Sequence, residues 1–569
     1  MNAHEISDDE FDDGRDDRSV TLDHDPGFGL EEVIDLTEEA DLSLTEDDYL
    51  ADADIRRLLG NWRENQSTSK TSYDPHRTVT DGIWVNGILY EKGHSVKLRK
   101  KGRYLRIRSV IQYTSGEIFF QGWNMIKTSK HKECYMPKEQ RWKPELVWIT
   151  NENDAEISIF DVERFVTIHL TNYCDITRDP HQGRLCRLKE TLDKRGGSIQ
   201  YISHHEADEG FRWNPVELRR LWRGGTRPFG EADQFTVKFC QPVTDLTGPD
   251  DETARLRRRR WYTFGDGFCG AGGVSCGANQ AGLEIKWAFD ASHRATESYR
   301  LNFDNAECEL GRIDHFLTND EDFQRVDVSH GSPPCQTFSP AHTKEGRHDD
   351  ENSACIFSCS DLIRAAKPRV HTMEETSGLL FGRYKETLSR VILDFLEMGY
   401  SVRWGLLYSV NYGVPQARKR LVIIASGPGE LLPQFPEPTH GPRELGLKPY
   451  TTINQTIAHI PTRAPDHDTQ AAYPEPKAPY DGNRQAKTIT CGGGEDYHPS
   501  GRRRFTNREL ACLQTFPLEF RFGRIEVRKQ IGNAVPPVLA RALYAEIIRS
   551  LRQTDEIEMR QIGQEEGEF

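Results

Sequence analysis

Cys335 is the residue best placed in this 569-residue chain to do covalent chemistry. It follows two prolines in the run Gly331-Ser332-Pro333-Pro334-Cys335-Gln336, directly after an apolar strand pattern. Prolines stiffen a loop, and α/β enzymes place their chemistry at the carboxyl ends of strands. A stabilised thiolate at this position can act as a nucleophile. The alternative is a buried, inert cysteine.

Two further strand ends carry charged or polar groups. The run Met373-Glu374-Glu375-Thr376 places two carboxylates side by side. Neighbouring residues of a strand face opposite sides, so one carboxylate is available as a general acid while the other is structural. Gln416, Arg418 and Arg420 alternate before the pattern LVIIAS, and alternate residues of an extended segment project to one side. We expect a polar row over the site, with a surface edge strand as the alternative.

A glycine-rich turn follows the first strand pattern of this region. It reads Phe268-Cys269-Gly270-Ala271-Gly272-Gly273, and Asp290 ends the next apolar strand. Glycines at a strand-to-helix turn let the backbone approach a ligand and direct N–H groups at it. An acid at the second strand end typically bonds ribose hydroxyls. Together they predict an adenosine-containing cofactor, with a tight structural turn as the alternative.

A doubly wound α/β sheet would bring these residues together. Strand patterns at WYTFGDGF, IKWAFD, FQRVDVSHG, RVHTMEE, SVRWGLLYS and RLVIIAS alternate with helical stretches near 273–282, 352–367, 386–398 and 536–550. This alternation is typical of a mostly parallel sheet with helices on both faces. Many prolines interrupt it between 428 and 486, and we expect residues 550–569 to form a disordered tail.

Composition excludes several classes of protein. No run of 18 or more apolar residues occurs, which excludes a membrane span, and the first residues lack the pattern of a secretory signal. The 12 cysteines are dispersed without CxxC pairs, so we expect neither a disulfide scaffold nor a metal site. Residues 1–50 contain 19 acidic residues and two arginines, which leaves 70 acidic and 72 basic residues elsewhere. The net charge of −15 therefore belongs to a tail and does not exclude nucleic acid as a partner.

The part of the chain before the α/β pattern divides into three segments. Residues 1–75 are acidic and predicted to be disordered, and Val33-Ile34-Asp35-Leu36 within them resembles a SUMO-interacting motif, with a chance cluster as the alternative. Residues 82–172 alternate apolar and polar positions between turns and resemble a BAH (bromo-adjacent homology) domain, a module that docks on chromatin proteins. Residues 173–260 read as a linker with short helices and a basic cluster at 255–260.

Six motifs in a fixed order resemble the C5-cytosine DNA methyltransferase family. They are FxGxGG, the Pro-Pro-Cys-Gln run, the Glu374 strand end, QxRxR, RELxxLQxFP and GNxVPP. The resemblance covers about residues 261–549 and implies a Rossmann-like, S-adenosylmethionine-dependent methyltransferase domain. Residues 428–500 occupy the place of the family's target-recognition region.

The resemblance also implies roles for individual residues. Those implied for S-adenosylmethionine binding are Phe268, Gly270, Gly272, Gly273, Asp290, Pro334, Asn533 and Val535. Cys335 matches the nucleophile that attacks C6 of a cytosine flipped out of double-stranded DNA, and Glu374 matches the acid at N3. Arg418 matches the arginine that contacts the activated base, Arg420 supports the loop, and Gln416 begins the same QxRxR motif. Arg502, Arg503 and Arg504 are expected to contact phosphate, with a solvated basic loop as the alternative.

The sequence departs from the family at one sensitive place. The usual Glu-Asn-Val is replaced by Glu374-Glu375-Thr376. One hypothesis is that Glu375 raises the pKa of Glu374 by like-charge repulsion; the other is a disturbed loop with weak activity. The same variant resembles the fungal subgroup named for "RIP defective", de novo methyltransferases linked to premeiotic repeat silencing.

Three functions follow from these observations. The first is a nuclear DNA cytosine-C5 methyltransferase with an N-terminal chromatin-binding module. The second is a catalytically weak or silent scaffold that binds DNA and partners in gene silencing. The third is an RNA cytosine methyltransferase, although the tripeptide Cys-Phe-Thr of that branch does not occur in the chain.

Overall fold

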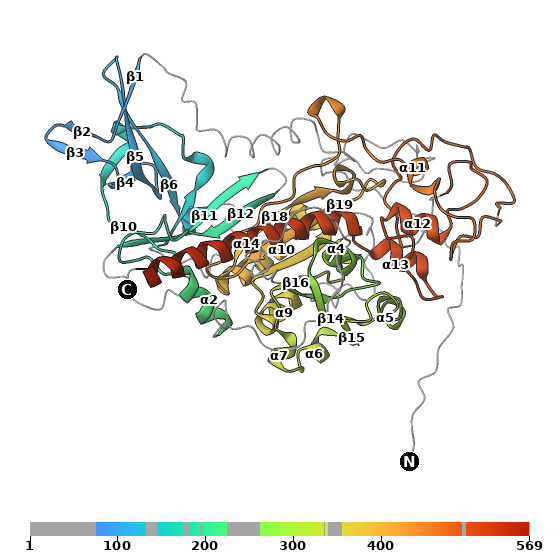
Figure 1. Cartoon of the computed structure of the whole chain (residues 1–569). Helices are drawn as coiled ribbons and strands as arrows, with labels where there is room; N and C mark the ends of the chain where they lie inside the picture. The colour runs from blue at the N-terminus through green and yellow to red at the C-terminus, as the bar shows by residue number, and fades with distance from the viewer. Residues whose placement is uncertain are drawn as a thin grey trace, which may run out of the picture. The chain divides into compact units, whose positions relative to one another are not determined.

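A computed structural model describes most of the chain (Figure 1). The described residues are 76–131, 145–173, 183–193, 196–224, 262–334, 336–338, 355–470, 472–491 and 497–567. They all lie within one compact unit. The motif at 33–36, the basic cluster at 255–260 and Cys335 itself lie outside the described residues.

The predicted doubly wound sheet is confirmed. Its strands are β13 (Thr263–Gly267), β14 (Glu284–Asp290), β15 (Glu307–Leu310), β16 (Val328–Gly331), β17 (Val370–Thr376), β18 (Ser401–Tyr408) and β19 (Lys419–Ser426). The pairings give the order β15-β14-β13-β16-β17-β19-β18, parallel from β15 to β17 and antiparallel around β19. The strand order reverses between β13 and β16, which is where such sheets bind ligands. Of these strands, only the short β15 was not predicted from the sequence.

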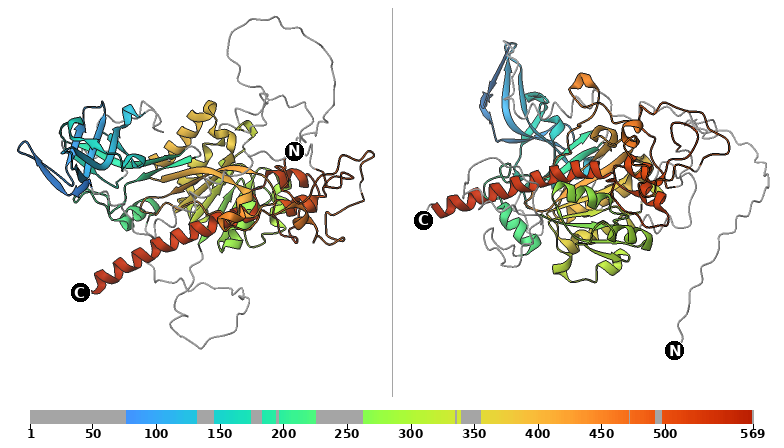
Figure 2. Two further views of the ribbon diagram at one scale, coloured as in Figure 1. Left: turned by 90° about the horizontal axis from the view of Figure 1, so that it is seen from above. Right: turned by 45° about the vertical axis from the view of Figure 1, so that its right-hand side comes forward.

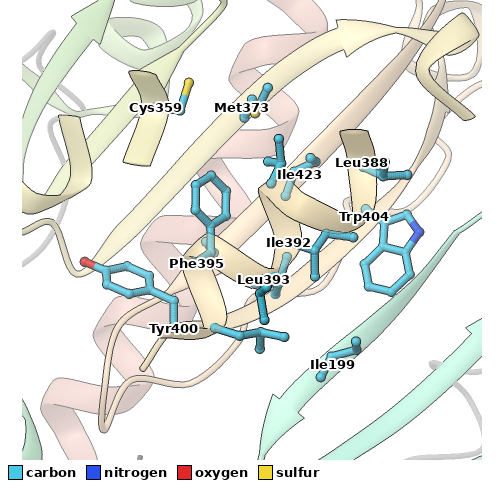
Figure 3. Packing of buried hydrophobic residues seen from close by; sticks show 14 of the residues in the cluster. Ile199, Cys359, Met373, Leu388, Ile392, Leu393, Phe395, Tyr400, Trp404 and Ile423 are labelled. Carbon is cyan, nitrogen blue, oxygen red and sulfur yellow. The ribbon is translucent and has the colours of Figure 1, made fainter. Parts of the chain in front are cut away.

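Helices cover both faces of this sheet. Helix α4 (Gly273–Ala281) and α14 (Pro537–Gly567) pack on one face with apolar residues of β13, β17 and β19. Helices α9 (Ser358–Ala366) and α10 (Lys385–Glu397) pack on the other. In Figure 3, Leu393 and Phe395 of α10 lie among Trp404 of β18, Ile423 of β19 and Ile199 of β12 (Gly196–Tyr201). The alternation along β19 explains this division, because successive residues of a strand face opposite layers.

The remaining helices surround these layers. They are α2 (Pro215–Arg223), α5 (His293–Arg300), α6 (Ile313–Phe316), α7 (Glu321–Gln324), α11 (Ile453–Ile457), α12 (Asn507–Leu513) and α13 (Val527–Asn533). Residues 428–500 contain little regular structure besides α11, as their proline content predicts. None of the helices in the described ranges is long and apolar enough to cross a membrane.

The N-terminal region is β-rich, as expected. Its strands are β1 (Arg77–Thr80), β2 (Gly82–Val85), β3 (Ile88–Glu91), β4 (Ser95–Leu98), β5 (Arg103–Tyr113), β6 (Ile118–Lys127), β7 (Glu145–Ile149), β8 (Ile157–Ser158), β9 (Val162–Phe165) and β10 (Ile168–Leu170). Two buried clusters, around Tyr104 and around Phe120, form its core.

The expected helical linker at 173–260 is wrong in its first half. Residues 184–201 form an antiparallel pair, β11 (Arg184–Asp193) and β12 (Gly196–Tyr201). Strand β11 pairs with β7 of the β-rich region, and β12 pairs with β18 of the α/β sheet, with Ile199 opposite Val402. A Cβ on Gly196 would lie 2.2 Å from the Trp404 carbonyl oxygen, so glycine permits this approach. One continuous sheet therefore joins both regions.

The expected disordered tail after residue 550 is also wrong. Helix α14 continues to Gly567 and is the long red helix in both views of Figure 2. Leu551 and Thr554 are buried, and Asp555 forms an ion pair with Arg369 at 2.7 Å. These contacts supply the stabilisation that the polar composition of the segment does not suggest.

Candidate active site

The glycine-rich turn lies between β13 and α4 and has the shape of a ligand cradle. Phe268, Gly270 and Gly272 all have positive φ angles, of 58°, 54° and 95°. Gly273 begins α4, and a Cβ there would lie 2.5 Å from the Val535 carbonyl oxygen. Only glycine allows this close passage of two backbone segments. The turn and the segment that begins α14 thus meet at the N-terminus of α4, as the family resemblance predicts.

Asp290 braces this cradle from the end of β14. Its Oδ2 accepts the Gly270 N–H at 2.9 Å, and its Oδ1 accepts the Ser292 N–H at 2.8 Å. Burial raises the pKa of Asp290, and these two hydrogen bonds lower it in part. Each carboxylate oxygen keeps a further lone pair, so the expected contact with ribose hydroxyls is compatible with the bracing role.

Asp266 is a second acid at the cradle, and its role was not predicted from the sequence. It is fully buried near the end of β13, where Ser275 of α4 donates to its Oδ2 at 2.6 Å. Burial raises the pKa of Asp266 to about 7. Its Oδ1 has no hydrogen-bond partner among the described residues, so the cradle contains a buried polar atom that suits a polar cofactor. An acid inside the otherwise apolar pattern WYTFGDGF was the available signal.

The nucleophile loop leaves β16 beside this cradle. Ser332, Pro333 and half-buried Pro334 lead toward Cys335, and a 3-10 turn at Gln336–Phe338 follows it. Strand β16 lies between β13 and β17. The loop therefore starts next to both the cofactor cradle and the Glu374 strand end.

Glu374 and Arg420 form the charged centre of the site. The Arg420 Nε lies 2.6 Å from the Glu374 Oε1, and both side chains are largely buried. They line a cavity of about 10 Å³ together with His330 and Val535, so the acid lies close to the segment that approaches the cradle. Burial lowers the pKa of His330 to about 3, which keeps this histidine neutral.

Gln416 and Arg418 do not join Arg420 in one row over the site. Gln416 is fully buried, donates to Gln514, and accepts the Ile489 N–H at 2.8 Å. The Arg418 guanidinium, also buried, donates to the carbonyls of Ile489 and Gly532. Both side chains hold the segment after residue 485 against the core. The structure thus places Arg420 against the catalytic acid and Arg418 against backbone carbonyls, and the expected contact of Arg418 with the base stays a prediction.

Glu375 faces the opposite side of β17 and is fully buried. Burial, and secondly the nearby Glu374 carboxylate, raise the pKa of Glu375 well above its usual range. The burial of Glu375 therefore favours its uncharged form.

The three consecutive arginines near residue 503 differ in their surroundings. Arg502 and Arg504 are exposed, as a phosphate contact requires. Arg503 instead forms two hydrogen bonds with Glu509, at 2.7 and 2.8 Å. Glu509 is the third residue of α12 and completes a capping box with Thr506. Arg503 thus stabilises the start of a helix, and the phosphate contact expected for the three arginines stays a prediction.

Asn533 is an exposed residue at the end of α13, close to the predicted cofactor segment. Its Oδ1 accepts a hydrogen bond from the Cys491 thiol at 2.5 Å. Within the described ranges, no group of three or more His, Cys, Asp or Glu side chains is arranged to bind a metal ion.

Comparison with known proteins agrees with this geometry. A model of the family described as C-5 cytosine-specific DNA methylase matches residues 262–475 and 470–549. The type II methyltransferase M.NgoFVII of Neisseria gonorrhoeae is 35% identical over 312 residues, which cover 48% of this chain and 82% of the relative. The type II methyltransferase M1.HphI of Haemophilus parahaemolyticus is 30% identical over 331 residues, which cover 50% and 87%. A methyltransferase structure from Entamoeba histolytica aligns with a TM-score of 0.40 at 14% identity, covering 52% of this chain and 99% of that one.

The match extends over half of this chain and over most of each bacterial relative, and it begins and ends with the α/β region described above. The chain belongs to the C-5 cytosine-specific DNA methylase family, whose members are DNA (cytosine-5) methyltransferases that use S-adenosylmethionine as the methyl donor.

Proposed function

We propose that this chain methylates C5 of a cytosine flipped out of duplex DNA, with Cys335 as nucleophile, Glu374 as acid and Arg420 as its charged partner. The observation that carries the proposal is the 2.6 Å ion pair between Arg420 and Glu374 at the end of β17. This pair lies beside the strand whose loop leads to Cys335. An acid and a cation therefore lie at the edge of the sheet from which the chain leads toward Cys335, and we propose that the base enters there.

The chain's own groups perform distinct parts of this reaction. The Cys335 thiolate forms a bond to C6 of the ring while Glu374 provides a proton or hydrogen bond at N3, so that C5 becomes nucleophilic. Arg420 holds Glu374 in place through their short contact. Phe268, Gly272 and Asp290 would hold S-adenosylmethionine, which supplies the methyl group when bound. Loss of the C5 proton and of the thiol completes the exchange.

Glu375 is compatible with activity because it faces away from the base. The neutral amide that family members carry at this position is replaced by a carboxyl group, and burial raises the pKa of that group and so favours its uncharged form. Glu375 and the short recognition region are the two observations that favour a silent scaffold. An uncharged polar group at position 375 weakens the first of them and supports the enzyme.

The finer biological role is also a proposal. The Glu374-Glu375-Thr376 variant supports membership of the "RIP defective" subgroup and de novo methylation in repeat silencing. The β-rich region supports a BAH-like module that docks on chromatin proteins. Nuclear localisation and SUMO binding through residues 33–36 follow from the same reading.

A covalent trap tests the activity. The full chain is incubated with S-adenosylmethionine and duplex DNA that contains 5-fluorocytosine, whose fluorine cannot leave C5 as a proton does. We expect a denaturant-stable adduct that Cys335→Ser abolishes. The absence of an adduct with intact DNA and cofactor binding would favour the scaffold. An adduct with tRNA and none with duplex DNA would favour the RNA methyltransferase.

A further inference from the structure

Two anchors of hydrogen bonds hold described residues that flank Cys335 in sequence, one before it and one after it. We infer that Thr376 and Tyr384 form the anchor after Cys335 and are positioning residues for the nucleophile. The inference rests on the proposed function, because it supposes that Cys335 reacts with the base.

The anchor before the cysteine starts from β16. Buried His330 forms a hydrogen bond through Nε2 with the Ser332 hydroxyl at 2.6 Å, and through Nδ1 with the Thr372 hydroxyl at 2.9 Å. A neutral imidazole has one donor and one acceptor, and both ring nitrogens are used. Ser332 lies three residues before Cys335, so the loop leaves the sheet from a fixed point.

The anchor after the cysteine consists of two hydroxyl groups. The Thr376 hydroxyl donates to the Phe338 carbonyl at 3.0 Å, and the Tyr384 hydroxyl donates to the Thr337 carbonyl at 2.8 Å. The Tyr384 ring also packs edge-on against buried Phe338, with ring centroids 5.1 Å apart. Thr337 and Phe338 are the second and third residues after Cys335, so both bonds fix the 3-10 turn that directly follows it in sequence.

The anchor is coupled to the acid through β17. Thr376 is the last residue of β17 and lies opposite Arg420 in the ladder with β19. Glu374 is two residues earlier, and residues two apart in a strand project to the same face. The same short stretch of strand therefore sets both the acid and the turn of the nucleophile. The family's usual valine has no hydroxyl, so the threonine adds a hydrogen bond that valine cannot make.

The test compares variants that change one hydroxyl each. Thr376→Val and Tyr384→Phe remove the hydroxyl at nearly constant volume, and Thr376→Ser keeps it. Tyr104→Phe is the matched control, because the Tyr104 hydroxyl is buried in the β-rich region and has no hydrogen-bond partner among the described residues. The full chain and the 5-fluorocytosine duplex are used throughout, and the rate of adduct formation is measured in a single turnover at saturating DNA.

We expect Thr376→Val and Tyr384→Phe each to slow adduct formation about three- to tenfold, as the loss of one hydrogen bond implies. The KM for DNA should not change, and Thr376→Ser and Tyr104→Phe should keep the parental rate. Parental rates in both hydroxyl-free variants would overturn the inference. An equal loss in Thr376→Ser would also overturn it, because the hydroxyl would then not be responsible.

A second readout separates this inference from the proposed function. Iodoacetamide alkylation of Cys335 is followed by mass spectrometry on the tryptic peptide 326–344, which contains no other cysteine. A loosened turn exposes the thiol, so we expect at least threefold faster alkylation in Thr376→Val and Tyr384→Phe without DNA. If the parent forms no adduct, the proposed function fails, and unchanged alkylation rates would then reject the anchor as well.

Discussion

Replacing Glu375 by glutamine should change stability relative to the parent more favourably at neutral pH than in acid. Glu375 is fully buried, and its pKa is raised well above the usual value of 4.5. Below that value both the folded and the unfolded chain carry the proton. Above it the unfolded chain releases the proton and the folded chain keeps it, so stability falls as pH rises until the folded pKa is reached.

The size of this effect follows from one proton. A single proton taken up on folding gives a slope of at most about 1.4 kcal/mol per pH unit, so two pH units amount to about 2.7 kcal/mol. Glutamine does not titrate and removes the slope. The amide changes the hydrogen bonding of the site by a constant amount, which shifts the whole curve and leaves its slope unchanged.

The assay is urea unfolding followed by tryptophan fluorescence at pH 5, 6, 7 and 8. We expect the stability difference between Glu375→Gln and the parent to grow steadily from pH 5 in favour of the variant. Glu397→Gln, at an exposed position at the end of α10, is the control and should show a flat difference. A flat difference for Glu375→Gln would refute the argument that burial holds a proton on Glu375.

Three further predictions concern the site. Glu374→Gln should lower kcat about 10²- to 10⁴-fold, as the loss of a general acid does, with DNA affinity retained in a filter-binding assay; retained turnover would exclude the acid role. Arg503→Ala should lower the free energy of unfolding by about 1–2 kcal/mol after allowance for solvent screening. Arg502→Ala should instead reduce the slope of log DNA affinity against log salt concentration by about one. Equal effects of the two variants on DNA binding would contradict the structural role of Arg503. Gly273→Ala should weaken S-adenosylmethionine binding at least tenfold in calorimetry, because its Cβ would lie 2.5 Å from a backbone oxygen, while Gly382→Ala, which has open space around it, should bind as the parent does.

The sequence predicts the α/β sheet well because its strands are long apolar runs that end in glycine, acid or proline. It predicts the cofactor turn for the same reason. It does not predict β12, because GGSIQY is short and rich in glycine and gains its order from pairing with β18. The extension of α14 likewise depends on an ion pair with Arg369, which is distant in sequence.

The roles of polar side chains are harder to read from spacing. Arg418 and Arg420 share a pattern, yet one binds backbone carbonyls and the other binds Glu374. Arg503 stands between two exposed arginines in the sequence, but its own side chain forms an ion pair with Glu509. The partner of each charged side chain depends on tertiary contacts, and the periodicity of the sequence contains no information about these contacts.

The pairing of β12 with β18 has a consequence for how the protein can be divided. Without β12, β18 would present a row of unpaired N–H and C=O groups at the rim of the sheet, and such rims recruit other chains and promote aggregation. Gly196 and Gly197 pack closely against Trp404, so a strand with larger residues at these positions could not pair with β18 in the same way. Strand β12 therefore covers the edge of the catalytic sheet. An attempt to excise residues 262–569 alone is expected to yield an insoluble product rather than a minimal methyltransferase.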